Sequence, residues 1–213
     1  MKRLLFAIAL GGALSGCATV RHPARPRPMG IVEKPVSAAW RDTIKLPDAA
    51  AIDAMPARWA AARTRAGKAG ARTIAAQGAL LGGAALDHPA PSPGPYRCRH
   101  VRLGSGGARA FPAATCFIGG DPGDMLSFTS QSGVDAPGGW LYPDDVTTRY
   151  VFLGARQLRP GTANLAYGKD VNRNLAGVVE RIGTFRWRLT IPAAADTLDV
   201  YELTPLANAA PAK

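Results

Sequence analysis

The sequence predicts an α+β fold, in which N-terminal helices precede a small antiparallel β-barrel or strongly curved sheet of about eight strands. Apolar residues recur at three- and four-residue steps from Ile52 to Ala66, which places them on one helix face. From Tyr96 onward the apolar period changes to two, the period of a strand. A proline-rich connection at residues 87–95 separates the two patterns, and we expect the boundary between a helical module and a barrel domain there.

Residues 1–16 have the pattern of a lipoprotein signal peptide, because basic Lys2 and Arg3 precede an apolar run that is too short to span a bilayer. The following Leu14-Ser15-Gly16-Cys17 resembles the lipobox of bacterial lipoproteins. We therefore expect Cys17 to be acylated and to begin the mature chain, although an ordinary signal peptide with a chance cysteine is the alternative. Ala18 follows the cysteine instead of Asp, which favours an outer-membrane lipoprotein that faces the periplasm.

The sequence predicts a tether at residues 17–36, because four prolines prevent a helix and favour an extended chain. Residues 37–86 predict a helical module, with Asp48 as a candidate cap. Pro56 interrupts the apolar pattern, so either the helix kinks there or a new helix begins. Gly67 and Gly70 are expected to end that element, and a second helix is expected over residues 71–81.

The barrel domain is expected at residues 96–205, and a loose tail is expected at residues 206–213. Turn sequences such as GSGG and PDD separate the segments with strand character. The eight expected strands cover residues 96–103, 114–119, 125–132, 139–143, 148–158, 175–183, 185–192 and 197–204. Short turns between successive strands favour a meander, and closure of that meander would remove its open edges.

Two cysteines remain once Cys17 is assigned to the lipid anchor. Cys98 and Cys116 form an even pair, which in an oxidising compartment predicts a disulfide; two buried free thiols are the alternative. A metal site is not expected from this pair, because no further ligands stand near enough to complete a tetrahedral set.

The net charge of +11 falls to +9 once Lys2 and Arg3 leave with the signal peptide. In the cytoplasm this excess would suggest nucleic acid, but the predicted location outside the cytosol argues against that partner. The expected partners are the membrane, through the lipid anchor, and anionic envelope polymers or an envelope protein. The sequence leaves the oligomeric state open.

Two arginines flank a tryptophan in the strand at residues 185–192. If Phe185, Trp187, Leu189 and Ile191 point into the barrel, Arg186 and Arg188 must point outward. A solvated outer face explains this alternation without a ligand. The alternative is that Arg186 and Arg188 form a partner-binding surface.

No catalytic set is organised in the sequence, and no cofactor is expected. His100 is the one histidine on an expected strand, where it shares a face with Tyr96 and Cys98. Asp170, Asn172 and Asn174 resemble the first half of a calcium loop, but Leu175 stands where that loop needs glycine, so no metal is predicted. Glu180 is expected to pair with Arg188 across a hairpin, or else to face the barrel interior.

Several motifs together resemble a bacterial envelope family without an assigned function, catalogued as domain of unknown function 4893. They are WRD at 40–42, PYRCR at 95–99, GWLYPDD followed by YVFLG, YGKDVNRNLAGVVERIG, FRWRL and TLDVYEL. The resemblance covers roughly residues 38–205 and implies a small secreted or lipid-anchored protein with helices first and a sheet after. It supplies no activity, and Asn174 stands where the family leads us to expect an acidic residue.

These observations favour a non-enzymatic binding or accessory module of the envelope. One alternative is a hydrolase that works through Asp144, Asp170 or Glu180. Another is a structural component of an envelope assembly, in which Arg186 and Arg188 or the helix that carries Trp59 forms the contact surface.

Overall fold

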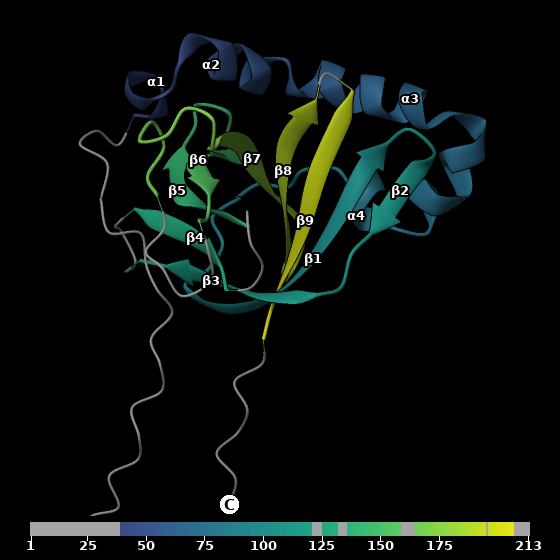
Figure 1. Ribbon diagram of the computed structural model, residues 1–213. Helices are drawn as coiled ribbons and strands as arrows, with labels where there is room; N and C mark the ends of the chain where they lie inside the picture. The colour runs from purple at the N-terminus through teal and green to yellow at the C-terminus, as the bar shows by residue number, and fades with distance from the viewer. Residues whose placement is uncertain (1–38, 121–124, 132–135, 159–164, 195, 207–213) are drawn as a thin grey trace, which may run out of the picture.

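The structure is a computed structural model that describes residues 39–120, 125–131, 136–158, 165–194 and 196–206. The expected signal peptide, the lipidation site Cys17, the tether and the C-terminal tail from residue 207 lie outside the described residues. Figure 1 shows helices along one side of a closed, twisted sheet.

The sheet is an eight-stranded antiparallel barrel with one additional strand, which confirms the expected α+β fold. Each barrel strand pairs with the next along the chain, and pairing of the first with the last closes the ring. The strands are β1 (Gly94–Gly104), β2 (Gly107–Ala110), β3 (Ala114–Gly119), β4 (Leu126–Ser130), β5 (Pro137–Pro143), β6 (Arg149–Arg156), β7 (Asn174–Gly183), β8 (Arg186–Ala194) and β9 (Thr197–Pro205). The additional strand is β2, which pairs with the end of β1 as a short hairpin.

The period of two in the sequence separates the inside of the barrel from its outside. One buried cluster takes side chains from all eight barrel strands and lies in the interior; it includes Trp187, Leu189 and Ile191 of β8. Phe185 was expected to join them, and that prediction is wrong because Phe185 is 70% exposed. The strand begins only at Arg186, and a register shift between Arg181 and Gly183 leaves Phe185 in the turn.

The helices are α1 (Trp40–Thr43), α2 (Leu46–Asp53), α3 (Met55–Ala75) and α4 (Ala79–Gly82). Pro56 lies in the first turn of α3. Of the two expectations, a kink or a new helix, the new helix is therefore confirmed. The expected end at Gly67 is instead a kink, because Gly67 has φ 64° while the helix continues to Ala75. The single helix expected over residues 71–81 is therefore divided between the end of α3 and the short α4.

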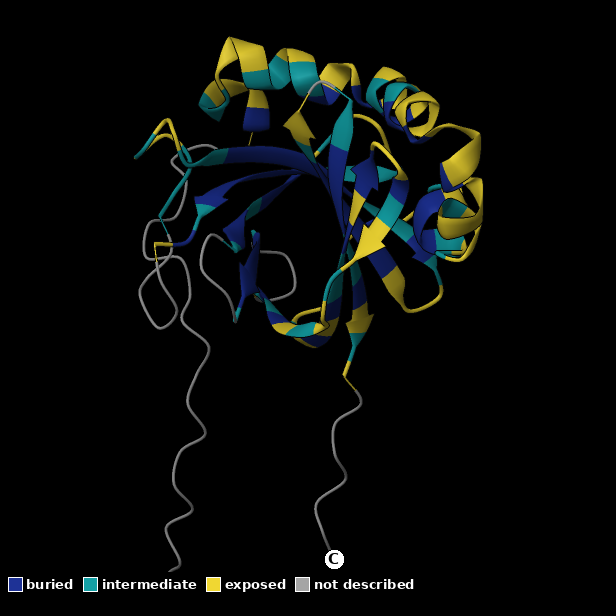
Figure 2. Ribbon diagram, turned by 45° about the vertical axis from the view of Figure 1, so that its right-hand side comes forward, coloured by how far each residue is buried: buried dark blue, intermediate teal, exposed yellow. Residues whose placement is uncertain are grey.

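The helices bury the outer face of the barrel on one side (Figure 2). The predicted helical stripe from Ile52 to Ala66 is buried there, together with Leu80 and Leu81 of α4. Its barrel counterparts are outward side chains of β1, β5, β6, β7 and β9. Close approach at one point requires glycine, because a Cβ on Gly70 of α3 would lie 2.6 Å from the Cα of Gly107 in β2. Helices and barrel thus share one core.

None of the helices in the described part of the chain has the length and the apolar character needed to cross a membrane.

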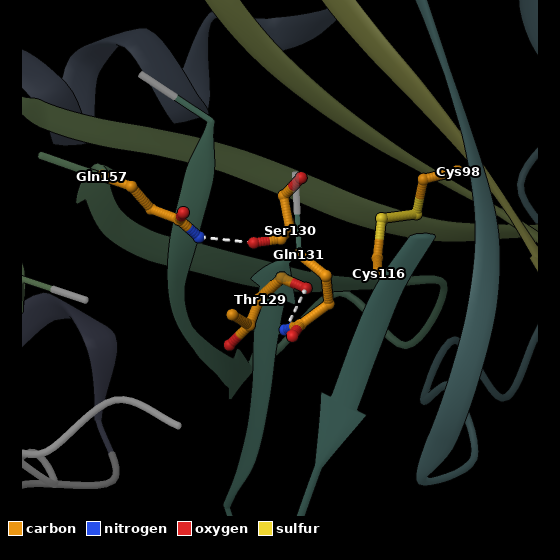
Figure 3. The surroundings of a disulfide bond; sticks show 6 residues. All are labelled: Cys98, Cys116, Thr129, Ser130, Gln131 and Gln157. Carbon is orange, nitrogen blue, oxygen red and sulfur yellow. Dashed lines mark hydrogen bonds between the residues drawn. A yellow bond between two sulfur atoms is a disulfide. The ribbon is translucent and has the colours of Figure 1, made fainter. Parts of the chain in front are cut away.

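A disulfide joins Cys98 of β1 to Cys116 of β3, as the cysteine pattern predicted (Figure 3). The two Cα atoms are 5.9 Å apart on neighbouring strands, where Cys98 lies opposite Ala114 and Cys116 lies opposite Tyr96. Close by, the amide Nε2 of Gln157 donates a hydrogen bond of 2.6 Å to the carbonyl oxygen of Ser130, which ties the end of β6 to the end of β4.

Removal of the disulfide is expected to lower the free energy of unfolding by about 3 kcal/mol, because the bridge constrains the unfolded chain. The bridge spans 18 residues of sequence. The measurement is urea unfolding of the wild type and of the Cys98→Ala/Cys116→Ala variant, each with and without reductant. Reductant should shift only the wild-type curve. A wild-type curve that does not respond to complete reduction would contradict the prediction.

Candidate binding pocket at one end of the barrel

A pocket of about 470 Å³ opens at one end of the barrel. Its side chains belong to the end where β4, β6 and β8 finish and β3, β5, β7 and β9 begin. The polar part of the lining comprises His100, Arg102, Ser130, Arg156, Asp199 and Tyr201. The apolar part includes Phe111, Pro137, Leu175 and Ile191. The volume lies within the range of sites that hold small organic molecules.

The opposite end of the barrel is filled. Aromatic rings cross there edge to face, with Tyr96 against Trp187 at 5.9 Å and Phe128 against Phe152 at 6.0 Å between centroids. The hydroxyl of Tyr96 donates to the carbonyl oxygen of Ser92 at 2.7 Å, yet burial raises the pKa of Tyr96 to about 12. The interior is therefore an apolar plug at one end and a polar pocket at the other.

The pairing of β1 with β9 brings the polar groups of the pocket together. In this register His100 lies opposite Tyr201, and Arg102 lies opposite Asp199. Residues two apart on a strand share a face, so His100 and Arg102 both face the interior, as do Asp199 and Tyr201. The two residues on β1 lie about 100 positions before the two on β9, and barrel closure makes the pairs neighbours.

Asp199 is the centre of a charged network and is 8% exposed. Arg102 donates to both of its carboxylate oxygens, from Nε at 2.8 Å and from a terminal nitrogen at 2.9 Å. The Nε2 atom of His100 lies 2.7 Å from Oδ1. Burial alone would raise the pKa of Asp199, but the hydrogen bonds from His100 and Arg102 outweigh burial and hold it below the usual value. Asp199 is thus a carboxylate, and His100 donates to it.

Two aromatic rings hold the imidazole of His100 between them. Phe111 stacks on one face with centroids 4.4 Å apart, and Tyr201 stacks on the other at 4.5 Å. Burial, followed by the nearby charge of Asp199, raises the pKa of Tyr201. The sandwich and the bond to Asp199 together fix the orientation of His100.

Arg156 brings a second guanidinium to the pocket, from the end of β6. Its main chain is fixed, because its N–H donates to the carbonyl of Arg173 and its own carbonyl accepts from Nε of Arg173 at 3.0 Å. Within the residues that the structure describes, no carboxylate pairs with the Arg156 side chain.

The two arginines predicted as a partner surface have different surroundings. Arg186 is exposed and lies 3.2 Å from Glu202. Arg188 is only 7% exposed, because α3 and α4 cover it. It donates to Glu180 at 2.6 Å and to the carbonyl of Gly83 at 2.9 Å. Burial therefore argues against Arg188 as part of a partner surface. Glu180 pairs with Arg188 as expected, but the pair lies beneath the helices and not on the solvated surface.

The acids considered for hydrolysis do not converge. Asp144 accepts from Arg149 at 2.5 Å and from the indole of Trp40 at 3.1 Å. Glu180 is bound to Arg188 beneath the helices. The carboxylate of Asp170 accepts from the main chain of Asn172 within its own loop. None of these three acids lines the pocket.

The calcium-like loop uses its oxygens to hold its own fold. Asp170 caps the turn, and the side-chain oxygen of Asn174 accepts from the N–H of Gly168 at 2.8 Å. Across the described ranges, no three side chains of His, Cys, Asp or Glu are placed to hold a metal ion.

Sequence reasoning selected His100 but missed its partners. Asp199 and Tyr201 stand in the alternating segment TLDVYEL, and their phase was a usable signal, because the same face of β9 carries the interior residue Leu203. Polar residues at the inward-facing positions of the first and the last strand would have indicated a polar end of the barrel, because closure pairs these two strands. Arg156 gave no such signal, because apolar residues stand at both phases of the expected strand at 148–158, so its alternation did not assign Arg156 to the interior.

The network around Asp199 predicts how stability depends on pH. The pKa of Asp199 is lower in the folded state than the ordinary value of 3.8. Its ionised carboxylate therefore contributes fully to the free energy of unfolding above pH 3.8, and this contribution is lost as the pH falls through the lower folded value. Asp199→Asn should flatten the acid side of the stability curve, measured by urea unfolding between about pH 2 and pH 6. Asp145→Asn, at an exposed position, is the control and should keep the wild-type slope. Equal slopes for Asp199→Asn and wild type would refute this role.

Comparison with known proteins identifies a family but no activity. The family described as a domain of unknown function (DUF4893) matches residues 40–203, which span the helices and nearly the whole barrel. No curated protein and no solved structure matches the chain. Because the match covers most of the sequence, this chain belongs to the DUF4893 family.

Proposed function

We propose that this chain is a non-enzymatic binding module of the bacterial cell envelope, in which the barrel pocket holds one small molecule. The observation that carries the proposal is the division of the interior between an apolar plug and an open polar pocket. Barrels of about eight strands are either filled by side chains or hold one small ligand. This barrel is filled at one end only.

The pocket is rigid where it is polar, which suits binding. His100 is fixed by two rings and one carboxylate, and Arg102 is fixed by both oxygens of Asp199. Groups that are held in place before a ligand arrives lose little freedom when it binds. The disulfide adds to this, because Cys98 lies in the pocket lining.

Catalysis has less support. A histidine oriented by a carboxylate is half of a nucleophilic triad, and His100 with Asp199 meets that description. A nucleophile should then contact the histidine, but in the described part of the chain its partners are Asp199 and the two stacked rings. The hydrolase alternative through Asp144, Asp170 or Glu180 loses support, since each carboxylate is bound elsewhere.

The location is part of the proposal. Acylation at Cys17 would anchor the chain in the outer membrane and hold the barrel in the periplasm, where a disulfide between Cys98 and Cys116 can form. A role as a structural component is weaker, because Trp59 is 9% exposed and Arg188 is covered. Of the residues named for such a contact, Arg186 remains exposed.

Native mass spectrometry of the protein, purified gently from its own cells, tests both parts of the proposal. We expect the mass of a chain that begins at an acylated Cys17, and an additional mass from a retained small molecule. An unprocessed precursor would contradict the location. A chain that carries no small molecule, from cells that express it at normal levels, would count against binding.

A pair of variants on β3 supplies the control. Ala114 lines the pocket, whereas its neighbour Thr115 is exposed on the opposite face of the strand. Ala114→Trp should fill the pocket and abolish the retained mass, and Thr115→Trp should leave it unchanged. Equal retention by both variants would place the ligand outside the barrel.

A further inference from the structure

We infer that the ligand of the barrel pocket is an amphiphilic organic acid, whose carboxylate pairs with Arg156 while an apolar body lies against the barrel wall. The inference rests on the proposed binding function and specifies its chemistry. It follows from the charges in the pocket, from the contacts of each charged group and from the apolar lining.

Positive groups outnumber negative groups in the pocket. Among the described residues, two guanidinium groups, on Arg102 and Arg156, line it against the single carboxylate of Asp199. The part of the lining that the structure describes therefore carries one positive charge that it does not neutralise. An anionic ligand is favoured in such a site, and a cationic ligand is repelled.

The carboxylate of Asp199 is already paired with groups of the pocket wall. Its Oδ1 accepts from His100 and from Nε of Arg102, and its Oδ2 accepts from a terminal nitrogen of Arg102. These hydrogen bonds use the Nε and one terminal nitrogen of Arg102 as donors. In this network the charge of Arg102 is balanced by that of Asp199, and the rings of Phe111 and Tyr201 stack on His100.

Of the two arginines that line the pocket, Arg156 is the one without a carboxylate partner among the described residues. It follows Phe152 and Gly154 on the inward face of β6, and it lies opposite Pro137 of β5. Its main chain is held on both sides by Arg173, so the position of its Cα is fixed. A guanidinium presents paired N–H donors that match the two oxygens of a carboxylate.

Most of the remaining lining is apolar and includes an aromatic ring. Leu175 and Ile191 line the pocket, and so does the ring of Phe111, which stacks on His100. A small inorganic anion would leave these surfaces in contact with water, whereas an organic acid covers them. The pocket of about 470 Å³ has room for a ligand with a ring or a short chain in addition to its acidic group.

A matched pair of probes tests the charge directly. 1-Naphthoic acid and its neutral amide, 1-naphthamide, have nearly the same shape, and their affinities can be measured by calorimetry at neutral pH. Wild-type protein should bind the acid roughly ten- to a hundred-fold more tightly, since a hydrogen bond to a charged group strengthens binding by that factor. Arg156→Gln should lose this preference while its affinity for the amide is unchanged, and Arg156→Lys should retain part of it.

Arg97→Gln is the control, because Arg97 is exposed on the outer face of β1 and its replacement removes the same charge from the chain. This variant should keep the wild-type preference for the acid. Equal affinity of the wild type for acid and amide would overturn the inference but leave the binding function standing. Failure of both probes to bind would count against the binding function as well. Loss of the preference in Arg97→Gln would show a general effect of net charge and would also overturn the assignment to Arg156.

Discussion

The pairing of β1 with β9 is the constraint on which the rest of this structure depends. It joins the first barrel strand to the last and turns a meander into a closed ring. The same register places His100 opposite Tyr201 and Arg102 opposite Asp199. Without closure these groups would lie on two open edges of a sheet, where charges are solvated and their pairing is weak. Within the barrel they form a network around a carboxylate that is 8% exposed.

The distribution of arginines follows from the same closure. Alternation along a closed strand assigns each charge either to the interior or to the outside. Arg102 and Arg156 face the pocket, whereas Arg188 faces outward and is then covered by α3 and α4. A strongly basic sequence therefore divides its charge between a pocket, a buried ion pair with Glu180 and the solvated surface. Net charge alone could not separate these three roles.

Local patterns predicted much of the fold. The period of two located all eight barrel strands, and the spacing from Ile52 to Ala66 identified the buried helical face. The errors arose where tertiary contacts decide. Phe185 has the interior phase but falls in a turn, and Arg188 has the outward phase but lies beneath helices that are distant in sequence. The strand β2 was missed because four residues, GARA, carry too little pattern.

The candidate site was less predictable for the same physical reason. Its residues come from strands that become neighbours only through closure, and one sequence does not show which strand meets which. His100 could be selected because it was the one histidine on an expected strand. Asp199 lies on an expected strand, but its contact with His100 depends on long-range register.

Amide hydrogen exchange at the β1–β9 seam is the most direct measurement of this account. Protons in the ladder from Cys98 to Leu103, and in the facing residues from Leu198 to Leu203, should exchange as slowly as those of the β6–β7 ladder. That result would show that closure is part of the cooperative fold. Exchange at the seam many times faster than between β6 and β7 would show that the ring opens between β1 and β9. It would remove the basis for the network and for the pocket.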